Sequence, residues 1–147
     1  MIYDIYIYIM DLTVEKEIIT KLSVNELETL IKTIDKTDQH CLLLKFTASW
    51  CGPCKTIKPI CDKYFKSLPE NVIISEIDID ESMDLYMFFK KGRIRVVNGI
   101  PAMLAWTPNN EREYDHWYLP DESVSGGDVR EVERFFKLIE EQANDLK

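Results

Sequence analysis

Apolar residues near the start of the chain follow first the spacing of strands and then the spacing of a helix. Residues 2–10 carry apolar side chains on both faces of an extended chain, and a second strand-like stretch follows at 17–22. Ser23 and Glu26 fit a capping box, and apolar residues then recur at helical spacing. The pattern predicts two strands followed by a helix over Val24–Lys36.

The middle of the chain repeats this order of strand and helix. The apolar run Cys41–Phe46 predicts a buried strand, and apolar positions from 57 to 65 predict the helix that follows it. Val72–Ile79 predicts another strand and Met83–Lys90 another helix. Gly92 follows two lysines and fits the C-cap of that helix, with cations at the negative end of the helix dipole.

The last third of the chain predicts a β-hairpin and a closing helix. Ala102–Trp106 fits a strand, residues 107–110 a turn, Glu113–Tyr118 a returning strand and Asp128–Leu146 a helix. Strand, helix and strand in succession imply a parallel pair with a right-handed crossover, and the hairpin adds antiparallel strands. The predicted fold class is therefore α/β, with a mixed sheet of about four or five strands, helices on both faces and an extra N-terminal strand.

Length and charge limit the classes of function. The chain has 147 residues and a formal charge of −8, which suits one acidic domain, expected over 12–147, preceded by an extension at 1–11. An acidic balance argues against nucleic acid and anionic membranes as partners. Residues 1–10 lack Lys and Arg and are too short to span a membrane, so we expect a cytoplasmic protein. The apolar extension either adds to a sheet edge or pairs with a second copy as a homodimer.

Two cysteines lie where a strand ends and a helix begins, in the sequence WCGPCK at residues 50–55. A thiol in the first turn of a helix faces unpaired N–H groups and the positive end of the dipole, which lowers its pKa. Cys51 is therefore the predicted nucleophile, and Cys54 can attack the mixed disulfide formed on it. Pro53 suits the first helical turn because it needs no N–H partner there.

This hexapeptide resembles the thioredoxin family, whose WCGPCK it matches without change. Phe46 in the preceding strand, Pro59 in the helix and the sequence Gly99-Ile100-Pro101 also match the family by position. The resemblance implies a thioredoxin fold and reduction of protein disulfides without a cofactor, with an upstream reductase as electron donor. It also implies a cis Ile100–Pro101 bond. The substrate-binding residues that it implies are Trp50, Gly52, Pro53, Ile100 and Pro101.

Two charges depart from the family pattern. Lys45 stands where thioredoxins have a buried aspartate, and Glu76 stands near the place of a family lysine. Because a buried lysine is costly unless it is paired, we predict an ion pair between the two behind the dithiol, with Glu76 exchanging the proton of Cys54. The alternative is that Lys45 extends to solvent and Glu76 is hydrated.

The other candidate residues favour packing over chemistry. The cysteines do not have the two close pairs typical of a zinc site, so Cys41 and Cys61 are predicted to be small buried hydrophobes. His40 and His116 lack ligand spacing. For the aromatic cluster after the hairpin we favour packing over cover of the substrate face. Its members are Trp106, His116, Trp117, Tyr118 and Leu119.

Two other uses of the same fold remain as alternatives. A binding module would dock a partner through the dithiol face or the N-terminal strand, with the redox chemistry incidental. An oxidase or isomerase is disfavoured because Pro53, and not histidine, precedes Cys54, a choice that accompanies reducing proteins in the family.

Overall fold

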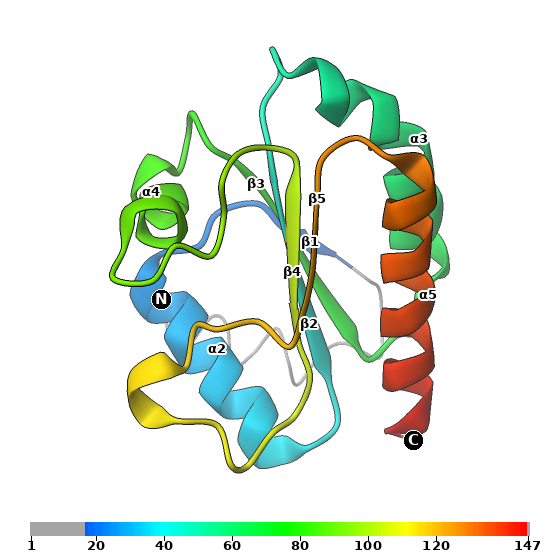
Figure 1. Cartoon of the computed structure of the whole chain (residues 1–147). Helices are drawn as coiled ribbons and strands as arrows, with labels where there is room; N and C mark the ends of the chain where they lie inside the picture. Colours follow the sequence, from blue (N-terminus) through cyan, green and yellow to red (C-terminus); the bar gives the residue numbers. More distant parts are fainter. Residues whose placement is uncertain (1–16, 147) are drawn as a thin grey trace.

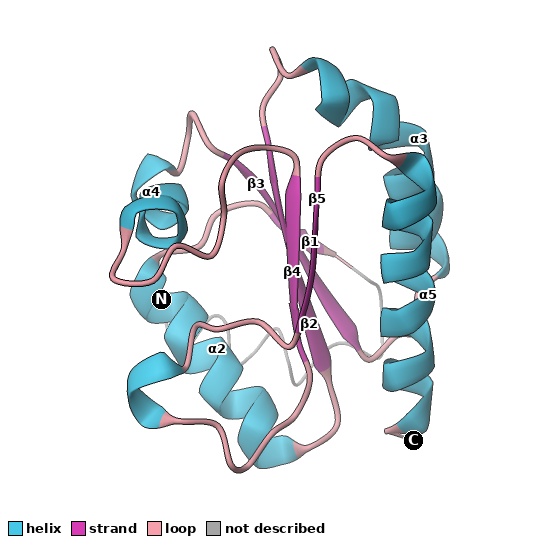
Figure 2. Ribbon diagram, viewed as in Figure 1, coloured by secondary structure: helices cyan, strands magenta, loops and turns pink. Residues whose placement is uncertain are grey.

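The centre of the molecule is a mixed sheet of five strands in the order β1-β3-β2-β4-β5 (Figure 2). The computed structural model describes residues 17–146. Strands β1 (Ile18–Ile19), β3 (Val72–Asp78) and β2 (Cys41–Thr47) run parallel. β4 (Ala102–Trp106) is antiparallel to β2, and β5 (Glu122–Ser125) is antiparallel to β4. The predicted α/β class and the mixed sheet are confirmed.

Four α-helices of residues 17–146 cover the two faces of this sheet (Figure 1). Helices α2 (Val24–Thr37) and α4 (Met83–Lys91) pack on one face. On the opposite face lie α3 (Gly52–Ser67) and α5 (Val129–Asp145). Each helix was predicted from apolar positions at helical spacing, and those positions form its buried side. The result is a three-layer α/β/α arrangement with a separate core on each side of the sheet.

Strand β2 is the central strand and contributes to both cores. Leu42, Leu44 and Phe46 face α2 and α4, whereas Cys41 and Leu43 face α3 and α5. All five are fully buried. A strand that is covered on both faces has apolar residues at consecutive positions. The apolar run Cys41–Phe46 therefore predicted a buried strand correctly.

The predicted returning strand at residues 113–118 is wrong. These residues hold a short 3₁₀ helix, η1 (Tyr114–His116), and the strand that returns after β4 and pairs with it is the later β5. Trp117 and Tyr118, although consecutive, both contact Phe88 of α4, with ring centroids 5.7 and 5.1 Å away. In a strand, consecutive side chains point to opposite faces of the sheet. Trp117 and Tyr118 pack on the same helix, so they do not form a strand. Trp106, Trp117 and Tyr118 are buried, as the packing prediction expected.

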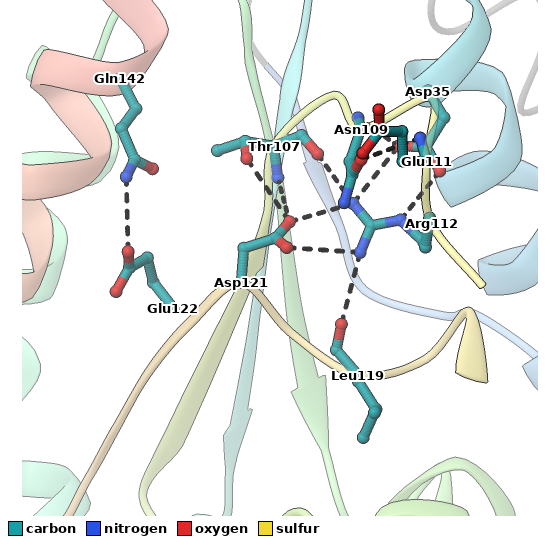
Figure 3. A network of polar contacts seen from close by, with 9 residues as sticks. All are labelled: Asp35, Thr107, Asn109, Glu111, Arg112, Leu119, Asp121, Glu122 and Gln142. Carbon is teal, nitrogen blue, oxygen red and sulfur yellow. Dashed lines mark hydrogen bonds and ion pairs between the residues drawn. The ribbon is translucent and has the colours of Figure 1, made fainter.

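Arg112 anchors this long connection to helix α2 (Figure 3). Its guanidinium donates from Nε to Asp35 Oδ2 at 2.8 Å and from Nη2 to Asp121 Oδ2 at 3.0 Å. Nη2 also donates to the Thr107 carbonyl at 2.8 Å, and the Arg112 side chain is only 8% exposed. The planar fork of arginine holds several acceptors at once, which fixes the segment without a strand.

The N-terminal predictions are only partly open to test. The strand expected at 2–10 and the extension at 1–11 lie outside the described residues. The strand expected at 17–22 is limited to β1, after which the chain leaves the sheet edge and Leu22 enters the core. Among residues 17–146, no helix has both the length and the apolar character needed to cross a membrane.

Candidate active site at the start of helix α3

The two cysteines lie in the turn that joins β2 to α3. Cys51 is the N-cap of α3, and its Sγ accepts the backbone N–H of Cys54 at 3.2 Å. The two residues are joined by a disulfide, with their Cα atoms 5.3 Å apart. Both are 4% exposed. The structure therefore describes the oxidised form, with Cys51 Sγ directed at the N–H groups of the first helical turn.

The residues that flank the dithiol are far more exposed than the sulfurs. Trp50 is 63% exposed, and its indole N–H donates to Asp80 Oδ2 at 2.8 Å. Gly52 and Pro53 are also exposed. Asp80 was not identified from the sequence, because only the fold brings the loop after β3 beside Trp50. This bond fixes the tryptophan at the edge of the site.

The bond between Ile100 and Pro101 is cis, as predicted. Pro101 is buried at the start of β4, and its carbonyl accepts the N–H of Gly126 at 2.9 Å. Ile100 is half-buried against the core cluster that includes Cys51 and Cys54. The fold therefore brings the predicted substrate-binding segments at 50–53 and 100–101 to one end of the molecule.

Two glycines before α5 also belong to this end and were missed. Gly126 has a φ of +91°, which favours glycine. A Cβ on Gly127 would lie 3.0 Å from Cβ of Pro53, so a side chain there would press on the turn that holds the dithiol. The Gly-Gly pair is visible in the sequence, but only the fold shows that it contacts Pro53.

Lys45 and Glu76 are paired across β2 and β3, as predicted. The two residues are register partners, and Lys45 Nζ lies 3.0 Å from Glu76 Oε2. The lysine side chain is 2% exposed and the glutamate side chain 32% exposed. Both line a cleft of about 370 Å³ that also includes Cys54. Lys55, Lys58 and Asp78 line it too, so the Lys45–Glu76 pair shares the cleft of the inner cysteine with a second carboxylate and two more lysines.

Cys41 and Cys61 are buried free thiols, as predicted. Burial raises the pKa of the Cys41 thiol to about 12. Burial also raises the pKa of Cys61, while the nearby ammonium of Lys45 opposes this effect by its charge and by a hydrogen bond. Both thiols are therefore in their unreactive protonated form near neutral pH.

The two histidines do not form a site within the described chain. Burial lowers the pKa of the half-buried His40. His116 Nδ1 lies 2.9 Å from Glu113 Oε2, one turn earlier. Within residues 17–146, no three His, Cys, Asp or Glu side chains are grouped so as to hold a metal ion.

Comparisons with known proteins place these observations in one family. A family model described as Thioredoxin matches residues 19–116. Human thioredoxin is 37% identical over 76 residues, which cover 42% of this chain and 69% of the human protein. Yeast mitochondrial thioredoxin 3 is 25% identical, with a TM-score of 0.57 over 82% of this chain and 93% of the yeast one. A poplar thioredoxin h shares the fold, with 18% identity and a TM-score of 0.59 over 83% and 95% of the two chains.

Proposed function

Because the chain belongs to the thioredoxin family, we propose that it reduces protein disulfides with the dithiol of Cys51 and Cys54. The family and the fold support thiol–disulfide oxidoreductase activity in general. The observation that carries the specific proposal is the place of Cys51 at the N-cap of α3, one turn from its disulfide partner. An upstream reductase, expected in the cytoplasm, would return the oxidised form to the dithiol.

The reaction is an exchange of two disulfides. The Cys51 thiolate attacks one sulfur of the substrate disulfide, that S–S bond breaks, and the departing substrate sulfur takes a proton. Cys54 then loses its proton and attacks Cys51 Sγ, which releases the second substrate sulfur. Two electrons pass to the substrate, and the product is the Cys51–Cys54 disulfide seen in the structure.

The position of each cysteine suits its role. The unpaired N–H groups at the start of α3 and the positive end of the helix dipole favour a thiolate on Cys51. Cys54 lies on the buried side of the same helix, next to the Lys45 and Glu76 cleft. Cys51 is the outer cysteine because exposed Trp50, Gly52 and Pro53 surround it.

The substrate chain would lie across the end of the molecule that holds the dithiol. Half-buried Ile100 precedes buried Pro101 at the start of β4, where Ala102 pairs with Phe46 of β2, and Trp50 offers an exposed ring held by Asp80. Gly127 lies against Pro53 with no room for a side chain between them. An extended substrate segment with its disulfide over Cys51 suits this surface.

Glu76 is the proposed acceptor of the Cys54 proton. It lines the same cleft as Cys54 and is one-third exposed, so a proton can pass from the cleft to solvent. Lys45 holds the carboxylate in place through the 3.0 Å ion pair.

A comparison of cysteine variants tests the proposal. We expect dithiothreitol-reduced wild type to reduce insulin disulfides, Cys51→Ser to be inactive, and Cys54→Ser to accumulate a mixed disulfide with the substrate. Mass spectrometry should place that bond on Cys51. Equal rates for wild type and Cys51→Ser would exclude the reductase and favour the binding module, for which redox chemistry is incidental.

A further inference from the structure

The segment from α4 to the cis-proline is cationic in a strongly acidic protein. Residues 85–110 contain no Asp or Glu, although the chain has 26 acidic residues among 147. Four of its 18 Lys and Arg residues lie within 90–95, in the sequence KKGRIR. This local charge of +4 contrasts with −8 for the whole chain.

The helix dipole accounts for only half of this charge. Lys90 and Lys91 lie in the last turn of α4, where cations stabilise a helix. Arg93 and Arg95 lie beyond the end of the helix and are exposed. Within residues 17–146 no ion pair joins either arginine to a carboxylate, in contrast to Arg112 with its two aspartates. The two arginines are therefore left for another role.

The backbone holds these charges in a defined position. A Cβ on Gly92 would lie 2.3 Å from the Phe88 carbonyl oxygen, so the chain turns there only with glycine. The N–H groups of Val96 and Val97 both donate to the Phe89 carbonyl, at 2.9 and 3.2 Å. The segment is thus folded back on α4, with Arg93 and Arg95 between two fixed points.

The cationic segment is joined to the cis-proline by a short stretch of chain, so its charges can act on a protein docked there. Arg95 precedes Pro101 by six residues, which span at most about 20 Å. A typical protein interface of about 800 Å² per partner has a radius of about 16 Å. Arg95 therefore lies at most a few Å (about 20 − 16) beyond the rim of an interface of that size centred on Pro101, within the ~8 Å over which charges act at physiological ionic strength.

The acidic residues that precede or begin α4 lie at the other end of the helix. Asp80 is held by Trp50, and Asp84 is in the first turn of the helix. The nine residues of α4 span about 13 Å, which separates these carboxylates from Arg93 and Arg95. Ile94, between the two arginines, is 37% exposed and adds an apolar contact.

We propose that residues 90–95 form a docking surface for proteins that carry acidic residues beside the disulfide to be reduced. This rests on the proposed reductase function, whose substrate class it narrows. A net charge of −8 repels acidic partners from most of the surface, and the cationic segment selects the one orientation that brings them to the dithiol. Charges at the rim of an interface act mainly on the rate of association and its salt dependence.

The test compares two disulfide-bridged peptides that differ only in a flanking run of glutamates or serines. Wild type and two double variants are assayed with each, at low salt and at ~0.15 M ionic strength. Arg93→Glu with Arg95→Glu changes the docking surface. The control is Lys63→Glu with Arg134→Glu, at exposed positions of α3 and α5 on the other face of the sheet. It changes the net charge of the protein from −8 to −12, as the arginine variant does (two residues, each changed by −2).

We expect wild type to have the higher kcat/KM for the acidic peptide at low salt. The arginine variant should lower the acidic-to-serine ratio about tenfold, the control much less, and salt should reduce the difference. Equal acidic-to-serine ratios of kcat/KM in the arginine variant and the control variant would overturn the proposed docking surface. A short single-stranded oligonucleotide that binds wild type more tightly than the acidic peptide would overturn the choice of a protein partner.

The serine peptide separates this proposal from the reductase itself. Loss of its reduction in every variant and in wild type would mean that the proposed function fails. Normal reduction of the serine peptide with no preference for the acidic one would reject only the docking surface. Melting temperatures of both double variants should stay close to wild type, since all four side chains are exposed.

Discussion

Glu76→Gln is expected to destabilise the protein, whereas Lys45→Met should not, although both substitutions remove the same ion pair. The asymmetry follows from burial, because the lysine side chain is 2% exposed and the glutamate side chain 32% exposed. Glu76→Gln leaves a buried ammonium without its carboxylate. Lys45→Met leaves a carboxylate that water can still reach, and methionine fills the space of the lysine stem.

The magnitude can be worked from the same exposures. Removal of one partner of a fully buried ion pair costs about 3–5 kcal/mol. Glu76 is one-third exposed, and glutamine keeps an oxygen acceptor near Nζ, so we expect about 2 kcal/mol for Glu76→Gln. For a chain of this length, that lowers Tm by about 4–8 °C. Lys45→Met should stay within about 1 kcal/mol of wild type.

Urea unfolding of the oxidised proteins at pH 7 measures these differences, with the Lys45→Met, Glu76→Gln double variant closing the cycle. The double variant should be about as stable as Lys45→Met alone, because the unpaired charge is gone. Equal costs for the two single variants would refute the burial argument. A Glu76→Gln protein as stable as wild type would show that the pair contributes nothing.

Three further outcomes follow from the described contacts. Arg112→Ala should cost about 3 kcal/mol in urea unfolding because it leaves two aspartates without their cation, yet insulin reduction should persist; loss of activity at unchanged stability would contradict a purely structural role. Gly127→Val should lower kcat/KM for insulin about tenfold by pressing on Pro53, with Ser125→Val, at an exposed position of β5, as the control; an unaffected rate would remove Gly127 from the site. At pH 8 iodoacetamide should label reduced Cys51 and leave Cys41 unmodified in the folded protein. The reason is that a pKa of about 12 for Cys41 leaves only about one thiolate in 10⁴. Rapid modification of Cys41, detected by mass spectrometry, would contradict its burial.

Local patterns predicted much of the secondary structure. The capping box at Ser23 forms as predicted, with Ser23 Oγ accepting the Glu26 N–H at 3.1 Å and Glu26 Oε1 accepting the Ser23 N–H at 2.9 Å. Helix α5 begins at Val129 after Asp128, whose side chain accepts the N–H groups of the first turn. These features depend on residues a few positions apart, so a single sequence contains the information.

The segment between β4 and α5 could not be predicted in the same way. Residues 113–118 have strand-like composition, yet their structure is decided by Phe88 and Asp35, which are distant in the sequence. The aromatic stacking and the Arg112 network outweigh the local preference for a strand. Both bury side chains that would be exposed if these residues formed a strand.

The sequence alone determined the order of the main elements, the dithiol and its place before a helix, because periodicity and capping act over neighbouring residues. It also identified the charges of Lys45 and Glu76, whose pairing depends on the parallel register of β2 and β3. Only the tertiary structure brought Asp80 to Trp50 and Gly127 to Pro53. These contacts join segments that are far apart in the chain, and such contacts form only when the two cores close around the sheet.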